Sequence, residues 1–278
     1  MNKGLQMDTI YVRSIFVSDV HLGCRYAQAE AFLSFLMQHN PDYVYLVGDV
    51  IDGWELKRRW HWRPEYNQII HRLLELARGG TQICYAPGNH DAFLRHFLQD
   101  FGWVDVADQF IHRAADDRRY LVLHGDQFDN VELRAPWLSV VGSIAYDVLL
   151  WAEWQANRLR RWCGWQRRSY SAPVKARVKG AMRFVSRFED RLARHARAED
   201  CEGVICGHIH TPTISRHQGI TYCNTGDWIE NCSALLEHSD GSMQILRFGP
   251  EFPGVPFQKD EPSSQKPAKP PQPQITAA

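Results

Sequence analysis

The chain has 278 residues, of which 44% are hydrophobic and 23% charged, and its 32 basic and 32 acidic residues give a formal net charge of zero. This composition is typical of a globular protein, and the zero charge excludes a strong overall attraction to nucleic acid or to an anionic membrane. The seven cysteines include no C-x-x-C pair, and neither a signal peptide nor a run of about 18 apolar residues occurs, so we expect reduced thiols and a cytoplasmic location.

Five short apolar runs are predicted to be strands, and each ends on a polar cluster. They are "SIFVSDVH" (14–21), "YVYLVGDVID" (43–52), "QICYAPGNHD" (82–91), "YLVLHGD" (120–126) and "GVICGHIH" (203–210). Helical periodicity separates the first three runs, over residues 29–39 and 67–80. This alternation of strands and helices predicts an α/β domain.

The later part of the chain predicts an insertion, a second sheet and a tail. Residues from about 130 to 198 have helical periodicity and no clear strand, which indicates a helical insertion. Three closely spaced strand candidates, 219–228, 233–238 and 242–248, suggest a second, antiparallel sheet and hence a layered sandwich. We expect residues 1–10 to be flexible, residues 11–250 to form the domain, and the Pro-rich tail 251–278 to be disordered.

The polar clusters at the five strand ends form the candidate site. Taken singly, each cluster also fits a helix cap or a tight turn. Together they fit one ligand-binding crevice, because loops at the carboxyl ends of strands gather in α/β proteins. Seven of their side chains offer oxygen or imidazole nitrogen and no thiolate: Asp19, His21, Asp49, Asn89, His124, His208 and His210.

Seven such donors exceed what one tetrahedral zinc ion binds and suit two adjacent transition-metal ions. Asp49, whose carboxylate has two oxygens, is the expected bridge. Two ions about 3.5–4 Å apart hold a hydroxide at neutral pH and clamp phosphoryl oxygens, which predicts phosphoester hydrolysis. An imidazole can donate a proton to a departing alkoxide, which makes His90 the candidate acid; the alternative is that its ring only packs beside the ligands.

The ordered series D-x-H, G-D-x-x-D, G-N-H-D, a later H and G-H-x-H resembles the calcineurin-like metallophosphoesterases over residues 13–247. The resemblance implies a four-layered α/β/β/α sandwich with two divalent metal ions, often manganese and in some members iron or zinc. It also implies that His90 contacts the phosphate and protonates the leaving group, with Asp91 orienting it. By position, one metal is assigned to Asp19, His21, Asp49 and His210, and the other to Asp49, Asn89, His124 and His208.

Within that superfamily, "SDVHLG", "YLVGDVIDGW", "APGNHD" and "NTGDWIENCSALLE" are similar to the UDP-2,3-diacylglucosamine pyrophosphatase family of lipid A biosynthesis. That similarity implies a nucleotide-linked glycolipid as substrate, cleaved to UMP and the lipid phosphate at the membrane surface. His90 stands where those enzymes usually carry arginine, and the insertion lacks their Asn- and Ser-rich stretch. The alternative is a phosphodiesterase or phosphatase of the same superfamily with a different substrate.

Residues 156–198 of the insertion contain thirteen Lys or Arg and two acidic residues, interleaved with aromatic residues. This pattern predicts contact with anionic headgroups or with an acylated substrate. A solvated helical face packed on the core is one alternative. Binding of single-stranded nucleic acid is another, which the zero net charge disfavours, so no nucleic acid partner is expected. A non-catalytic, peripheral membrane-binding module is the remaining alternative function, and the sequence does not predict an oligomeric state.

Overall fold

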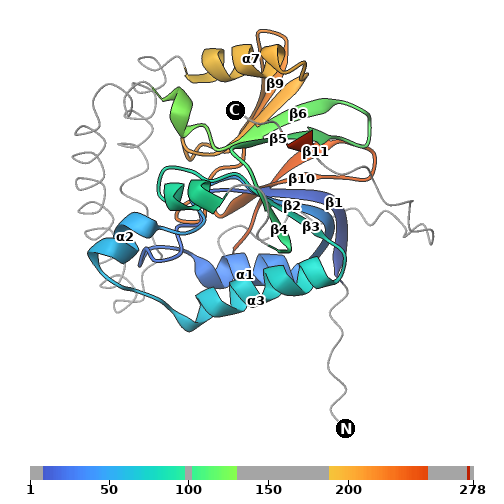
Figure 1. The fold of residues 1–278 in the computed structure, drawn as a ribbon. Coiled ribbons are helices and arrows are strands. Elements are labelled where there is room, and N and C mark those ends of the chain that lie inside the picture. Colours follow the sequence, from blue (N-terminus) through green and yellow to red (C-terminus); the bar gives the residue numbers. More distant parts are fainter. Residues whose placement is uncertain (1–8, 98–101, 130–187, 250–273, 276–278) are drawn as a thin grey trace, which may run out of the picture. The chain divides into compact units, whose positions relative to one another are not determined.

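The structure is a computed structural model that describes residues 9–97, 102–129, 188–249 and 274–275 (Figure 1). Most of the predicted insertion, including its tryptophans, therefore lies outside the described residues. Contacts divide the chain into one compact unit formed by Met1–Gly125 and Ala193–Ala278 and another formed by Asp126–Leu192. The domain and insertion boundaries expected from the sequence stay predictions.

The first sheet has the strand order β11-β10-β1-β2-β3-β4. Strands β1 (Ile10–Val17), β2 (His39–Leu46), β3 (Gln82–Tyr85) and β4 (Val104–Val106) are parallel. Strands β10 (Ser233–Glu237) and β11 (Met243–Arg247) extend the sheet beyond β1 in antiparallel pairings. Helices α1 (Ala29–Gln38) and α3 (Pro64–Arg78) cover one face of this sheet (Figure 1).

The second sheet has the order β12-β5-β6-β7-β9-β8. Its strands are β5 (Gln109–Arg113), β6 (Arg119–Leu123), β7 (Gly203–Cys206), β8 (Thr213–His217), β9 (Ile220–Asn224) and β12 (Gln274–Ile275). The pairs β6·β7 and β7·β9 are parallel, and the other pairs are antiparallel. The last residues of helix α7 (Phe188–Ala198) contact this sheet. Nε2 of His195 lies 2.7 Å from Oε1 of Gln109 on β5.

Two apolar clusters hold these layers together. One packs the buried faces of α1 and α3, including Phe32, Phe35 and Ile69, against the first sheet. The other lies between the two sheets and includes Tyr45 and Phe110. Together with α7, this arrangement is an α/β/β/α sandwich, and it confirms the predicted fold class. No helix of the described ranges is long and apolar enough to cross a bilayer.

The five predicted strands and both predicted helices form, but the strands belong to two sheets. The first three are β1, β2 and β3 of the first sheet, whereas the other two are β6 and β7 of the second. The expectation that the three late strand candidates form a second sheet is wrong, because β10 and β11 join the first sheet and β9 joins the second. Gln274 and Ile275 pair with the edge strand β5, and the disorder expected of the tail stays a prediction.

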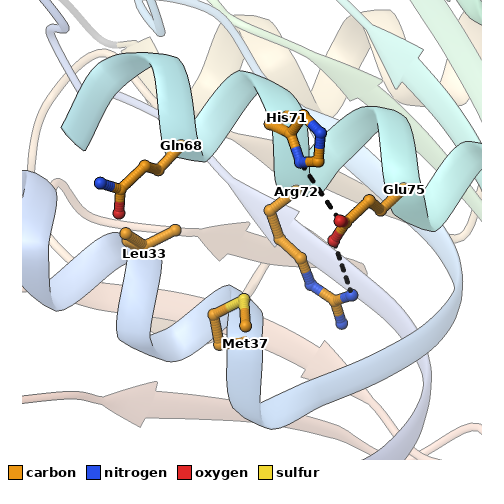
Figure 2. A pocket seen from close by; sticks show the side chains of 6 residues that line it. All are labelled: Leu33, Met37, Gln68, His71, Arg72 and Glu75. Atoms are coloured by element: carbon orange, nitrogen blue, oxygen red, sulfur yellow. Dashed lines mark ion pairs between the residues drawn. The ribbon is translucent and has the colours of Figure 1, made fainter. Parts of the chain in front are cut away.

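A groove with a volume of about 260 Å³ lies between α1 and α3 (Figure 2). Its apolar wall is formed by Leu33 and Met37, and its polar wall by His71, Arg72 and Glu75. Glu75 pairs with both other side chains of this wall, at 3.2 Å from His71 and 3.7 Å from Arg72. None of the candidate site residues lines this groove.

A buried charged network joins the two sheets at Glu237 of β10. Its carboxylate accepts hydrogen bonds from Arg13 Nη1 at 2.6 Å, Ser14 Oγ at 2.5 Å and the Ala115 amide at 2.8 Å, and lies 2.7 Å from Nε2 of His112. Burial alone raises the pKa of Glu237, but the hydrogen bonds from His112 and Ser14 and the charge of Arg13 lower it overall. The ionised carboxylate therefore stabilises the native state.

We expect Glu237→Gln to lower the free energy of unfolding by about 3 kcal/mol at pH 7, because it leaves Arg13 buried without its counter-charge. A lowered native-state pKa stabilises the fold above the unfolded-state pKa of about 4.3. This stabilisation is lost as the pH falls through the native-state pKa, so the difference between variant and wild type should shrink in acid. Urea denaturation measures it, with the exposed Glu75→Gln as the matched control; equal losses in both variants would contradict the prediction.

Candidate metal centre

The predicted site residues lie on the loops that follow five strands of the two sheets. Asp19 and His21 follow β1, Asp49 follows β2, and the segment 89–91 follows β3. His124 follows β6, and the pair at 208 and 210 follows β7. Both sheets therefore contribute to one site, although three of these strands lie in one sheet and two in the other.

Five of the seven predicted metal-binding residues have a left-handed backbone conformation. Their φ angles are 53° at Asp19, 52° at His21, 54° at Asp49, 67° at His208 and 48° at His210. Asp and His tolerate this region better than most residues with a Cβ, and strained backbone of this kind occurs often at functional sites. The left-handed residues turn the chain sharply as it leaves each strand.

At two positions the backbone lies so close to these side chains that only glycine fits. A Cβ on Gly88 would lie 2.6 Å from Cδ2 of His124, and one on Gly207 would lie 2.5 Å from Oδ2 of Asp19. Any larger residue would displace the side chain that it meets. The glycines of the "GN" and "GH" pairs thus let the two sheets approach each other at the site.

Three groups of candidate ligand atoms converge here, the atoms of each group lying within 4.8 Å of one another. The groups are Asp19, His21 and His210; Asp19, Asp49 and His124; and His21, Asp52 and His90. The carboxylate common to the first two groups is Asp19, whereas the sequence predicted Asp49 as the bridge. His208 belongs to none of the groups, but its ring lies 5.2 Å from that of His124.

The first group is centred on the buried Asp19, with His21 buried and His210 half-buried. Its Oδ1 lies 2.9 Å from Nε2 of His210 and 3.8 Å from Nε2 of His21, and its Oδ2 accepts the backbone amide of His208 at 3.0 Å. Within the described residues, neither Asp19 Oδ1 nor His21 Nε2 forms a hydrogen bond of normal geometry, although both are buried and His210 Nε2 approaches Asp19 Oδ1. Two such atoms facing the same space are the arrangement expected of metal ligands, since buried polar atoms otherwise find a partner.

The second group is fixed by backbone contacts. His124 Nδ1 lies 2.8 Å from the carbonyl oxygen of Val47, which orients the ring so that Nε2 lies 3.2 Å from Oδ2 of Asp49. The other carboxylate oxygen of Asp49 accepts the backbone amide of His90 at 2.8 Å. That bond holds the loop carrying Asn89 beside Asp49.

Asp52, to which the sequence analysis assigned no role, connects His21 to His90. Its Oδ2 lies 3.2 Å from Nδ1 of His21, and its Oδ1 lies 3.0 Å from Nδ1 of His90. The two imidazole rings meet edge to face with centroids 4.6 Å apart. A carboxylate on Nδ1 leaves Nε2 of each ring available for a metal ion or a substrate.

Asp91, which the sequence analysis expected to orient His90, is directed elsewhere. Its carboxylate accepts hydrogen bonds from the amides of Gly88 at 2.6 Å and Val50 at 2.8 Å and from the hydroxyl of Tyr85. Asp91 therefore holds the loop between β3 and His90 in place, whereas the carboxylate beside the His90 ring belongs to Asp52. The adjacent position in the sequence suggested a contact that the turn of the chain does not make.

The three buried carboxylates of these groups make the centre favourable for cations. Burial alone lowers the pKa of His21, but the hydrogen bond to Asp52 and the charges of Asp49, Asp52 and Asp19 raise it to about 9. Burial raises the pKa of Asp52, but the hydrogen bonds to His21 and His90 lower it overall. Buried carboxylates that stay ionised beside imidazoles fit divalent metal ions, which bind deprotonated ligands of both kinds.

The chain matches the family model described as Calcineurin-like phosphoesterase over residues 12–212. It is 32% identical over 117 residues to the UDP-2,3-diacylglucosamine hydrolase of Tolumonas auensis, covering 41% of this chain and 46% of that relative, about half its length. It is 25% identical over 246 residues to the UDP-2,3-diacylglucosamine hydrolase of Neisseria gonorrhoeae, covering 84% of this chain and 97% of that one. A solved structure of a Vps29 mutant from Entamoeba histolytica aligns with a TM-score of 0.44 and 15% identity, covering 84% of this chain and 89% of that chain.

Proposed function

Because the chain belongs to the calcineurin-like phosphoesterase family and is therefore a hydrolase of phosphoesters, we propose that it uses two divalent metal ions to cleave the pyrophosphate of UDP-2,3-diacylglucosamine or a related nucleotide-linked lipid. The products are UMP and the lipid phosphate. The observation that carries the metal-dependent chemistry is the convergence of buried carboxylates and imidazoles from both sheets. The names of the relatives from Tolumonas auensis and Neisseria gonorrhoeae support the substrate.

The proposed metal ligands are the seven residues expected from the sequence: Asp19, His21, Asp49, Asn89, His124, His208 and His210. When bound, the ions lower the pKa of water and offset charge on the phosphoryl oxygens. Manganese is the first candidate, and iron and zinc are the alternatives. Contact with a membrane through residues 156–198 and a cytoplasmic location stay predictions.

The residues of the chain divide the remaining work between positioning and proton transfer. The carboxylate of Asp52 accepts a hydrogen bond from Nδ1 of His90. The proton that His90 can donate to a substrate is therefore the one on Nε2. His90 is proposed to give this proton to the leaving group. Asp91 is proposed as a positioning residue, because it binds the amides that shape the loop before His90.

The proposed function is tested by measuring UMP release from UDP-2,3-diacylglucosamine in mixed micelles with the manganese-loaded protein. Release that depends on Asp49 would support both the reaction and the substrate. Absence of release, with hydrolysis of a generic aryl phosphoester retained, would preserve the metal-dependent chemistry and remove the glycolipid as substrate.

A second candidate is a phosphodiesterase or phosphatase of the same superfamily that acts on another substrate. The observation that favours it is His90 itself, at the position where the similar lipid A enzymes usually carry arginine. Rapid turnover of small soluble phosphoesters, without preference for an acylated substrate, would distinguish this candidate from the first.

We expect Asp52→Asn to weaken metal binding or activity by about 10- to 100-fold, because a carboxylate that orients a metal-binding histidine typically contributes this much. Asparagine can still cap α2 (Gly53–Arg58), where Asp52 Oδ1 accepts the amide of Glu55 at 2.9 Å, so the loop should stay folded. Metal affinity and kcat are to be measured together, with Glu55→Gln as the control. Wild-type values for both would show that Asp52 has no positioning role.

A further inference from the structure

Helix α2 and the residue pair that follows it carry an exposed surface of basic and aromatic side chains next to His90. Trp54 is 50% exposed and Trp60 is 74% exposed, and the three basic residues between them are exposed as well. We call these five residues the α2 surface: Trp54, Lys57, Arg58, Arg59 and Trp60. The residue expected to contact the phosphate and this surface both lie in the unit formed by Met1–Gly125 and Ala193–Ala278.

Three of the five side chains of the α2 surface share one side of a short, anchored helix, and the other two follow its end. Trp54, Lys57 and Arg58 are spaced i, i+3 and i+4, which places them on the same face. Leu56 points inward, because a Cβ on Gly23 would lie 2.7 Å from its Cγ. Leu56 therefore anchors the helix to the loop after β1.

The charge of this segment is strongly positive although the whole chain is neutral. Residues 53–63 contain four Lys or Arg and a single acidic residue, Glu55, which pairs with Arg58 at 3.1 Å. Arg63 is paired with Glu65 at 3.1 Å and with Glu30 at 2.8 Å. In the described part of the chain, Lys57 and Arg59 form no ion pair, so their charges face solvent.

Both tryptophans of the α2 surface are held in place by other rings. The indole of Trp60 stacks on Trp62 at 5.9 Å, and Trp62 packs against the buried ring of Tyr66 in α3 at 5.3 Å. Trp54 lies against the His90 ring with centroids 4.1 Å apart, and the Gly53 amide donates to the carbonyl of His90 at 3.1 Å. The exposed rings are thus rigid, which lowers the entropic cost of using them in binding.

We propose that the α2 surface binds the anionic headgroup layer of a lipid bilayer and so brings the candidate centre to the membrane. Trp prefers the boundary between headgroups and acyl chains, since its ring is apolar and its N–H is polar. Clustered Lys and Arg are attracted to anionic lipids. This goes beyond the proposed function, because it assigns a membrane contact to described residues outside the predicted insertion.

The spacing of charge and rings favours a lipid surface over nucleic acid. Single-strand binding uses a positive groove in which successive bases stack on aromatic rings. The α2 surface instead presents its rings and charges on one short helix and the two residues that follow it, where the described residues form no such groove. A planar, anionic and partly apolar boundary matches its five side chains better.

The test is the partition of the purified full-length chain between water and vesicles of phosphatidylcholine, with and without phosphatidylglycerol. We expect wild type to bind only the anionic vesicles, and added salt to weaken the binding. The double variant Lys57→Ala/Arg59→Ala should bind about 25-fold more weakly, at about five-fold for each charge removed. Trp60→Ala should also bind more weakly, because it removes the ring that enters the boundary.

The matched control is Arg113→Ala/Arg216→Ala, which removes two exposed charges from strands β5 and β8 and should bind vesicles as wild type does. Equal binding of the Lys57/Arg59 variant and wild type would overturn the proposal, as would indifference to anionic lipid or binding to a single-stranded oligonucleotide without vesicle binding. Hydrolysis of a soluble aryl phosphoester should be unchanged in all these variants. A chain that binds anionic vesicles through α2 but hydrolyses nothing would contradict the proposed function and leave this inference intact.

Discussion

Replacing Asp49 with asparagine is expected to lower kcat/KM for phosphoester hydrolysis by a factor on the order of 10³. Asparagine keeps the size of the side chain and removes the charge that attracts a metal ion. Asp49 lies 3.2 Å from His124, a candidate ligand on the second sheet, and accepts a hydrogen bond from the backbone amide of His90, the proposed acid. Asp49 therefore connects these two parts of the site. Metal content and steady-state kinetics on the same preparation measure the effect.

The control for Asp49 is Asp240→Asn, an exposed carboxylate in the turn between β10 and β11. It should leave metal content and turnover at wild-type values. If Asp49→Asn retained both metal ions and full turnover, the proposed two-metal centre would be wrong. Loss of turnover with full metal content would instead limit the role of Asp49 to positioning His90.

His90→Gln is expected to lower kcat by about 10²- to 10⁴-fold for substrates whose leaving group must be protonated. The loss should be small for an aryl ester whose leaving group departs as a stable anion, because that step needs no acid. The measurement is kcat for a series of esters with leaving groups of increasing pKa. The slope of log kcat against leaving-group pKa should become steeper in the variant.

A matched control for His90 is His96→Gln, an exposed histidine six residues further along in the 3-10 helix Ala92–Phe97. It should reproduce the wild-type slope. Equal losses for all leaving groups in His90→Gln, with metal content unchanged, would show that His90 binds the phosphate without donating a proton.

The strands and helices of this fold could be predicted because each has a local apolar pattern. The runs that became β1, β2 and β3 end where the predicted polar clusters begin, so the strand-end position of the site followed directly. Sheet membership could not be predicted, since β10 joins β1 through contacts such as Ser14 with Glu237, 223 residues apart in the chain. Short elements such as β5 and α2 were missed because too few residues carry their pattern.

The ligand types of the site were predictable from sequence, but the side chains that orient them were not. Asp52 was visible in "GDVID", and nothing in that motif indicates that its two oxygens reach His21 and His90, 31 and 38 residues away. Asp91 was misinterpreted for the same reason, because adjacency in the sequence says little about direction where the backbone turns. Nothing in the sequence indicated that the ring of Trp54 lies against the ring of His90.

The contribution of both sheets to one centre has a thermodynamic consequence. Ions held between loops of the two sheets bind the native chain and not the unfolded one, so their binding energy is added to the free energy of unfolding. At a free ion concentration of 100 Kd this linkage amounts to about 2.7 kcal/mol. The melting temperature therefore becomes a function of free metal concentration, and calorimetric scans at matched concentrations of manganese, iron and zinc rank the ions by affinity without any substrate.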